Sequence, residues 1–418
     1  MAITKGTNIK VDINVATNNA NLGGVDLWKK TGLECSTIME SFVVNYKGNN
    51  DLYIAQCTTG ATNPDRGATQ GDIDLNRVDK NATKQSVIRF RKPDETTYWD
   101  GTSTRQYNDF FENYNRIKNG ISGWGHPSQI AIEYAPDGAY IWVPHDCPMV
   151  ARVKNQAEKM TDVYFQQTRL ARVKLEEAQT YYANESTQAT RVKTFTLTSR
   201  IAGLTSSSNV LVSIDNVNKV LGLLYKDQDD VWKVTTFSIA YNSSYATSLK
   251  MSDIVFTELE TTVVSPVRYP RVTQLGWSKM RYKDLSPGGF AIFGDYVYIF
   301  YGSSYWDKTG DSGQNTFYAP TPAMVTSGSY MFDENGEVVK STKCGNSTLQ
   351  CINRYTKAVE TSQTEAGKSI TFRETAGLFI IPTLDSSGNV TTLELLLGFA
   401  GGTVGSRDWT IMSKKTTI

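Results

Sequence analysis

The segment GWGHPSQIAIEYAPDGAYIWVPHD, residues Gly123–Asp146, has the pattern of two β-strands joined by a tight turn. Apolar and polar residues alternate from Gln129 to Tyr134, and β-branched and aromatic residues resume from Ala139 to Val143. Between these runs, Asp137-Gly138 is a strong signal for a hairpin turn. The segment therefore predicts a β-hairpin.

Four other segments share this layout of an apolar strand, a turn and a second strand rich in Tyr, Ile, Leu or Phe. They begin at Met39, Ser208, Gly276 and Ala376. Further strand-like runs follow the hairpins and begin at Ser86, Thr168, Val231, Leu349 and Asp408. Repeated units of a few strands, none able to bury its apolar face alone, are typical of a β-propeller or a related radial array. The sequence thus predicts an all-β fold, an irregular five-bladed β-propeller with long loop insertions and a short N-terminal extension.

The predicted domains are an N-terminal extension, residues 1–35, and a propeller, residues 36–418, with a large insertion near 303–368. The alternating run Ile9–Thr17 could pair with the C-terminal blade and close a ring, or could attach the chain to a partner. Within the propeller, residues 58–84 have the composition of a polar loop. Two segments have helical patterns, Tyr107–Ile117 and Lys154–Gln167.

Composition is that of a large globular protein without a dominant charge. The chain has 418 residues, of which 39% are hydrophobic and 20% charged, and its formal net charge is +1. A basic excess normally accompanies nucleic-acid binding, so no nucleic-acid partner is expected. The first residues hold no apolar leader and no run is long enough to span a bilayer, so we expect synthesis in the cytoplasm without a signal peptide, and no membrane insertion.

Five cysteines form no metal-ligand spacing. Cys344 and Cys351 are close enough in sequence to form a loop-closing disulfide, and the alternative is that all five cysteines are reduced and packed.

The runs GWGHPSQIAIEY, DGAYIWVPHD and TRLARVKL together resemble the blade signature of the helveticin J and teichoic-acid-biosynthesis-C-like group. In that group a strand with Gly-His, a Tyr-Ile strand and an Ile/Leu-Ala-Arg-Val strand recur. The resemblance covers Gly123–Leu175 best and is weaker at LGWSKMRY and YVYIFYG. The chain departs from the pattern in its long loops and in the lack of Gly-His before the other hairpins. The resemblance implies a five-bladed propeller similar to those in receptor-binding proteins and tail fibres of phages that infect Gram-positive bacteria.

Catalytic motifs are weak in this sequence. His126 and His145 are the only histidines, and no Gly-x-Ser-x-Gly elbow lies between a strand and a helix. His145, Asp146 and Cys147 are adjacent, and neighbours in a strand point to opposite faces, so they are poorly placed to bind one metal ion. No pair of carboxylates is singled out. We therefore predict no enzyme activity, no cofactor and no metal. For both histidines, a structural role is favoured over a functional one.

Aromatic residues in loops favour carbohydrate binding, because the C–H face of a sugar stacks on Trp or Tyr while polar groups bind its hydroxyls. Tyr-Trp-Asp occurs twice, and Trp124 and His126 precede the central hairpin. The predicted ligand-binding residues are Tyr98, Trp99, Asp100, Trp124, His126, Tyr305, Trp306 and Asp307. The alternative is that these aromatic side chains pack their own loops against the propeller.

The sequence and the resemblance together predict a phage virion protein, a tail fibre or receptor-binding protein, that binds a cell-wall glycopolymer such as teichoic acid on a Gram-positive host. Its other expected partners are virion proteins, and we expect a homo-oligomer, most simply a trimer by the family resemblance. One alternative is a structural virion protein that docks another subunit without touching a host ligand. Another is a secreted bacteriolysin like helveticin.

Overall fold

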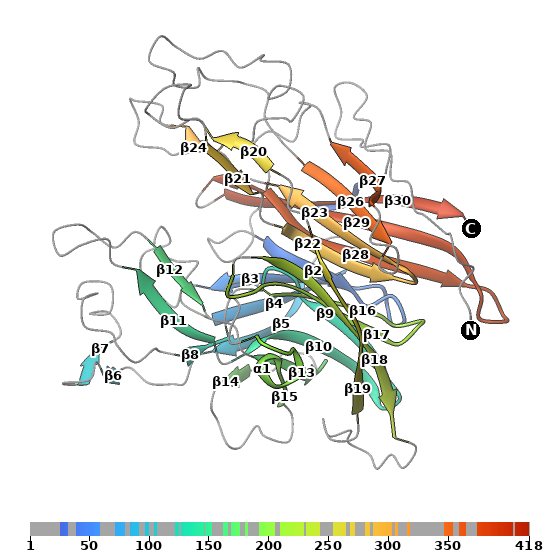
Figure 1. Ribbon diagram of the computed structural model, residues 1–418, viewed down its shortest axis with the longest axis horizontal. Coiled ribbons are helices and arrows are strands. Elements are labelled where there is room, and N and C mark those ends of the chain that lie inside the picture. The colour runs from blue at the N-terminus through green and yellow to red at the C-terminus, as the bar shows by residue number, and fades with distance from the viewer. Residues whose placement is uncertain are drawn as a thin grey trace, which may run out of the picture. The chain divides into compact units, whose positions relative to one another are not determined.

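The computed structural model is almost entirely β-strand in the part of the chain that it describes (Figure 1). A single helical turn, α1 (Leu197–Arg200), is the one helix among these residues. The described residues are 26–31, 39–58, 72–79, 84–91, 97–99, 104–106, 122–124, 127–145, 147–152, 162–165, 169–175, 180–182, 192–204, 210–229, 231–242, 254–264, 268–271, 281–284, 287–302, 306–307, 316–317, 347–353, 359–364, 374–403 and 406–417.

The chain divides into two compact units. We name residues 34–263 the central unit, and residues 1–33 together with 264–418 the terminal unit. Within the described ranges, no helix has the length and apolar character needed to cross a membrane.

The first sheet of the central unit is an antiparallel meander, with one short parallel strand added beside its last member. Its order is β2 (Met39–Val44), β3 (Leu52–Thr58), β4 (Asp72–Val78), β5 (Lys84–Arg91) and β14 (Thr180–Tyr182). In β4, Ile73 and Leu75 are buried while Asp74 between them is partly exposed. This alternation is the period of a strand with one face in the core.

The second and third sheets of the central unit are also antiparallel, with each strand paired to the next strand of the same sheet. The second sheet contains β9 (Ala131–Ala135), β10 (Gly138–His145), β13 (Arg169–Lys174) and β15 (Val192–Thr196). The third contains β16 (Val210–Asp215), β17 (Val220–Lys226), β18 (Trp232–Tyr241) and β19 (Ile254–Val263).

Successive sheets of the central unit meet through their first strands, because β9 contacts both β2 and β16. Beyond these first strands, a hydrophobic core cluster joins the second and third sheets, and its aromatic members meet edge to face. Phe195 lies 5.0 Å from Phe256 and 5.8 Å from both Trp142 and Phe237, measured between ring centroids. Such pairs each add about 0.5–1.5 kcal/mol beyond the burial of apolar area. The second and third sheets therefore bury apolar side chains against each other.

The terminal unit contains two further four-stranded antiparallel sheets. The first has β22 (Pro287–Phe293), β23 (Tyr296–Gly302), β26 (Ser347–Asn353) and β27 (Val359–Thr364). The second has β28 (Glu374–Leu384), β29 (Val390–Thr403), β30 (Ser406–Thr417) and β1 (Asp26–Thr31). A strand from the N-terminal region thus completes the sheet built by the C-terminal residues.

The first strands of these two sheets, β22 and β28, lie in close contact, and glycine makes this approach possible. A Cβ atom added at Gly289 would come within 2.7 Å of the backbone carbon of Gly377. One added at Gly288 would lie 2.5 Å from the carbonyl oxygen of Thr375. Real Cβ atoms do not approach backbone this closely, so larger residues at either position would separate the strands.

Short strands form smaller ribbons beside the five main sheets. They are β6 (Thr97–Trp99) with β7 (Thr104–Gln106), β11 (Cys147–Arg152) with both β8 (Ser122–Gly123) and β12 (Asp162–Phe165), β20 (Arg268–Arg271) with β21 (Arg281–Asp284), and β24 (Trp306–Asp307) with β25 (Thr316–Phe317).

The structure confirms the all-β prediction, and each of the five predicted hairpins supplies the first two strands of a separate sheet. Two local predictions are wrong. The predicted helix Lys154–Gln167 contains β12, which pairs with β11, and the predicted loop 58–84 contains β4. In both cases pairing with a neighbouring strand overrides the local composition.

Four other predictions lie wholly or partly outside the described residues. They are the helix Tyr107–Ile117, the alternating run Ile9–Thr17, the bridge from Cys344 and much of the insertion 303–368. The division into residues 1–35 and 36–418 stays a prediction.

Candidate functional site

The predicted sugar-binding aromatics fall on two ribbons of paired short strands. Tyr98 and Trp99 lie in β6, where Trp99 pairs with Thr104 of β7. Trp306 lies in β24 and pairs with Phe317 of β25. Asp307 follows Trp306 in the same strand. The backbone pairing of these residues is described but their side chains are not, so their role in binding stays a prediction.

The remaining predicted residues Asp100, His126 and Tyr305 lie outside the described residues.

Trp124 has a described side chain, and it is fully buried. Its ring meets Phe90 of β5 edge to face at 4.8 Å and His145 of β10 at 4.9 Å, both between ring centroids. The indole therefore packs in the interior of the central unit, as the packing alternative expects. A buried ring has no face available to a sugar, so this predicted contact does not fit the structure.

A pocket of about 580 Å³ opens in the central unit where the hairpin turns of its three sheets come together. We name it the turn pocket. The turns are those between β2 and β3, between β9 and β10, and between β16 and β17. Its lining residues are Asn45, Lys47, Gly48, Tyr134, Ala135, Pro136, Gly138, Ala139, Lys219 and Tyr241.

Local hydrogen bonds fix the β2–β3 turn. The carbonyl oxygen of Asn45 accepts hydrogen bonds from the backbone N–H groups of Gly48, at 3.0 Å, and Asn50, at 3.1 Å. The backbone N–H of Asn45 donates to the carbonyl of Asp51 at 2.9 Å. Asn50 adopts a positive φ of 61°, which asparagine tolerates better than most residues. The turn places Lys47 at its exposed tip.

The β16–β17 turn is an Asx turn built on Asp215. Its carboxylate accepts hydrogen bonds from the backbone N–H groups of Val217, at 2.9 Å, and Asn218, at 3.0 Å, and from the side chain of Asn218 at 2.6 Å. Lys219 closes the turn with φ of 55°. This carboxylate is therefore committed to holding the turn that presents Lys219.

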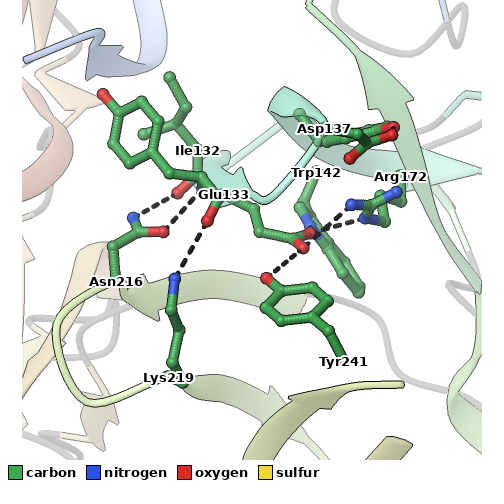
Figure 2. Close-up of polar contacts among 10 residues, drawn as sticks. Ile132, Glu133, Asp137, Trp142, Arg172, Asn216, Lys219 and Tyr241 are labelled. Carbon is green, nitrogen blue, oxygen red and sulfur yellow. Dashed lines mark hydrogen bonds and ion pairs between the residues drawn. The ribbon is translucent and has the colours of Figure 1, made fainter. Parts of the chain in front are cut away.

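Asn216 connects this turn to the second sheet (Figure 2). Its side-chain oxygen accepts a hydrogen bond from the backbone N–H of Tyr134 at 2.8 Å, and its amide nitrogen donates to the carbonyl of Ile132 at 2.9 Å. The side chain thus occupies backbone groups of β9, the edge strand of its sheet, much as a further strand would. The contact fixes the β16–β17 turn against β9.

Tyr134 contacts several residues at the turn pocket through its hydroxyl and its ring. Its hydroxyl donates to Asn45 Oδ1 at 3.1 Å and accepts from the backbone N–H of Lys47 at 3.2 Å. Tyr46 packs edge to face on its ring, with 5.0 Å between centroids. Burial raises the pKa of both tyrosines, so both hydroxyls stay neutral throughout the physiological range.

A buried ionic network lies behind the pocket (Figure 2). The carboxylate of Glu133 accepts two hydrogen bonds from the guanidinium of Arg172, at 2.7 and 3.0 Å. It also accepts from the indole N–H of Trp142 and from the hydroxyl of Tyr241, each at 2.7 Å. The side chain of Glu133 is 1% exposed and that of Arg172 is 0% exposed. The four hydrogen bonds that Glu133 accepts offset part of the cost of burying this pair, and one of them fixes the ring of Tyr241 at the pocket.

Two lysines face the pocket without such compensation. Lys219 donates from Nζ to the carbonyl of Tyr134 at 3.0 Å, and its Nζ lies 5.6 Å from the ring centroid of Tyr241. Lys47 Nζ lies 5.0 Å from the ring centroid of Tyr134. Among the residues that the structure describes, no carboxylate forms an ion pair with either ammonium group.

The environment of the two lysines disfavours their positive charge. Burial lowers the pKa of Lys47 and of Lys219, and the charge of Lys47 lowers the pKa of Lys219 further. Glu133 and Asp215 act in the opposite direction on Lys219, but more weakly. The pocket therefore contains two partly desolvated cations beside tyrosine rings.

Sequence reasoning missed this site because no motif marks it. Lys47 and Lys219 each lie in a polar turn and look like ordinary surface residues. The one available signal was the repeat, since turns at equivalent places in successive repeats gather at the same end of a repeat array.

No cluster of three or more His, Cys, Asp or Glu side chains that could bind a metal occurs among the described residues. In the described part of the turn pocket, the groups available to a ligand are ammonium, amide and phenol groups. These can bind and orient a ligand, and they include no paired carboxylates of the kind that glycoside hydrolysis needs.

No protein-family model matches the chain, and no curated protein matches its sequence. Among solved structures it is similar to a tail fibre of a Staphylococcus aureus phage, with a TM-score of 0.45 and 13% identity over 93% of this chain and 52% of the fibre. The chain thus spans about half the length of that fibre. It is also similar to a protein of uncharacterised family from Bacteroides eggerthii, with a TM-score of 0.28 and 8% identity over 94% of this chain and 77% of the other. A third similar structure is a Synechocystis apocarotenoid oxygenase, with a TM-score of 0.29 and 8% identity over 91% and 64% of the two chains.

Proposed function

We propose that this chain is a phage virion protein, a tail fibre or receptor-binding protein, that binds a cell-wall glycopolymer of a Gram-positive host. The resemblance in sequence over Gly123–Leu175 supports the class. The three runs that carry it supply β9, β10 and β13, which are successive strands of one sheet. The three runs therefore contribute neighbouring strands to one sheet, which supports reading them as a blade signature.

The proposed architecture is a five-bladed propeller in which each main sheet is one blade. Two features support it. In each unit the first strands of successive sheets are neighbours, as the innermost strands of blades are. In addition, β1 pairs with β30, so that the last sheet is completed by a strand from the opposite end of the chain. Such pairing removes an exposed sheet edge.

The turn pocket is the observation that carries the binding proposal. Three successive hairpin turns converge on it, and Tyr134 and Tyr241 line it beside the polar side chain of Asn45. Tyrosine rings can stack on the C–H face of a sugar while amide groups bind its hydroxyls. Its volume lies in the range of pockets that bind small ligands. A glycopolymer segment fits this chemistry.

Additional sugar contacts are proposed at the two Tyr-Trp-Asp motifs, Tyr98–Asp100 and Tyr305–Asp307, and at His126. Trp124 is left out because its ring is buried.

Adsorption of the purified chain to Gram-positive cell walls tests the proposal. Trp99→Ala and Trp306→Ala should weaken adsorption by about 1 kcal/mol or more and leave the melting temperature nearly unchanged. Trp124→Ala is the matched control, because loss of a buried indole should cost about 3 kcal/mol of stability while the folded fraction still adsorbs. Absence of adsorption by the wild type, with the chain present in purified virions, would favour a structural virion protein that docks another subunit.

A further inference from the structure

We infer that the turn pocket is an anion site for a phosphate group, held between the ammonium groups of Lys47 and Lys219. If the ligand belongs to the host cell wall, the phosphate is a phosphodiester within the glycopolymer, and this part of the inference rests on the proposed function. The same chemistry would also accept free inorganic phosphate or a small polyol phosphate.

The first argument is the placement of the two cations. Lys47 comes from the β2–β3 turn and Lys219 from the β16–β17 turn, and each lies near a tyrosine ring that lines the same pocket. They are close enough for the charge of one to act on the other. Like charges that converge in a partly desolvated space repel, and an anion between them removes that cost.

The second argument is that the neighbouring carboxylates are already committed. Glu133 is bound by Arg172, Trp142 and Tyr241, and Asp215 holds its own turn together. One carboxylate oxygen of Asp137, beside the pocket, accepts a hydrogen bond from the hydroxyl of Tyr140 at 2.5 Å. The scaffold thus uses Glu133 and Asp215 for structure and leaves two ammonium groups without an ion-pair partner among the described residues.

The third argument concerns the kind of anion. Two ammonium groups on opposite turns can bind different oxygens of one tetrahedral group, and lysine is a common phosphate ligand that acts as a point charge. At about 580 Å³ the pocket is much larger than a phosphate, and the remaining space is bordered by Tyr134, Tyr241 and Asn45. A polyol or sugar attached to the phosphate would use that space, which favours a phosphate ester over a small carboxylate.

The first experiment measures binding of inorganic phosphate, glycerol 3-phosphate and acetate to the full chain by isothermal calorimetry. We expect both phosphates to bind and acetate to bind far more weakly. Lys47→Gln and Lys219→Gln should each weaken phosphate binding about tenfold or more, as loss of one charge-assisted hydrogen bond does. Lys47→Arg should retain most of the affinity because it keeps the charge.

Lys415→Gln is the matched control, since it removes one positive charge from an exposed side chain on β30, outside the pocket. It should bind phosphate like the wild type. Melting temperatures identify any variant that fails to fold, and Lys47→Gln changes only an exposed turn tip, so it tests the inference even if Lys219→Gln unfolds. Undetectable phosphate binding, equal binding by the lysine variants and Lys415→Gln, or equal binding of acetate would overturn the inference.

A second experiment separates this inference from the proposed function. Cell walls are compared before and after treatment with hydrofluoric acid, which cleaves phosphodiester bonds. We expect the wild type to lose most adsorption on treated walls, and the two Lys→Gln variants to adsorb poorly to untreated ones. Equal adsorption of wild type and variants to both kinds of wall overturns the phosphodiester assignment and leaves wall binding intact. Phosphate binding that depends on the lysines, without any wall adsorption, overturns the proposed function and supports free phosphate or a small phosphate ester as the ligand.

Discussion

Two clusters of charge lie close together in the central unit, and they are built in opposite ways. The Glu133–Arg172 pair is fully buried, and its carboxylate accepts four hydrogen bonds. Lys47 and Lys219 line an open pocket, and neither has a carboxylate partner among the described residues. A buried charge depends on its internal partners, so that removing one of them is costly, whereas charges that line a pocket are available to a ligand. The proposed ligand site therefore rests on the two charges that the scaffold does not pair with a carboxylate among the described residues.

The largest effect should follow from breaking the buried pair. Glu133→Gln leaves the guanidinium of Arg172 in the interior without its counter-charge, and such a change costs about 3–5 kcal/mol of unfolding free energy. Urea unfolding measures it. Lys415→Gln, which disturbs a 3.7 Å surface pair with Glu394, is the control and should cost less than about 1 kcal/mol. Equal losses of unfolding free energy in Glu133→Gln and Lys415→Gln would contradict the distinction between buried and exposed charge.

A change at the boundary of the two clusters should affect both stability and binding. Asn216→Ala removes the amide that bonds Tyr134 N–H and the Ile132 carbonyl, and each unpaired backbone group costs about 1–3 kcal/mol if it stays buried. Phosphate affinity should also fall, because Asn216 fixes the turn that carries Lys219. Thermal melting and calorimetry measure the two effects. Reduced stability with unchanged affinity would show that the pocket does not depend on this contact.

Tyr241→Phe should distinguish the effect of the buried Glu133 network on stability from the effect of the pocket on binding. The variant loses the hydrogen bond to Glu133 and keeps the ring that borders the pocket, so stability should fall by about 1.5–3 kcal/mol, as for other hydrogen bonds to charged groups. If the ligand contacts only the ring of Tyr241, phosphate affinity should stay within about twofold of wild type. This is a small change, since a tenfold change in affinity corresponds to about 1.4 kcal/mol. A large loss of affinity would instead mean that the hydroxyl contacts the ligand.

The smallest effect should be the pH dependence of phosphate binding. Burial lowers the pKa of both pocket lysines, so they lose their protons below the ordinary lysine value of 10.5. Affinity should therefore fall as pH rises through this lowered range, where the phosphate dianion no longer titrates. Tyr46 and Tyr134 stay neutral there because burial raises the pKa of each. Calorimetry across this range on wild type and Lys47→Gln gives the two profiles, and a flat wild-type profile would exclude lysine as the ligand.

The same lysines should also affect stability. Because their pKa is lower in the folded chain than in the unfolded one, the unfolded chain holds more protons between the two values. Stability should rise with pH across that interval and not fall. Urea unfolding of wild type and Lys219→Gln across this pH interval measures the effect. The part of the pH dependence that comes from Lys219 should be absent from the variant.

Strand positions were largely predictable because they depend on a pattern of period two. The hairpin Gly123–Asp146 and its four counterparts were found from alternating apolar residues and turn signals, and all five form paired strands. The failures have local causes. The polar residues in DIDLNRV hid the buried positions Ile73 and Leu75 of β4, and β12 lies in a segment whose apolar spacing also suits a helix.

The candidate site was predicted far less well than the fold. Aromatic residues in polar surroundings predict sugar contacts, but Trp124 is packed against Phe90 and His145. Hydrophobic pattern alone does not tell an exposed ring from one that another segment covers. No sequence pattern marks Lys47 and Lys219 as ligands, because lysine is a common residue in surface turns.

The sequence by itself determined that the chain forms many short antiparallel strands in repeated units, since alternation and turn chemistry act between residues close in the chain. Only the tertiary structure decided which turns meet. Asn45, Tyr134 and Lys219 are separated by 89 and 85 positions, and they share a pocket because three sheets pack through their first strands. Contacts at such separation depend on how whole sheets are placed, and no local pattern encodes them. The tertiary structure likewise decided that Glu133 takes Arg172 as its partner and that Lys47 and Lys219 line the turn pocket.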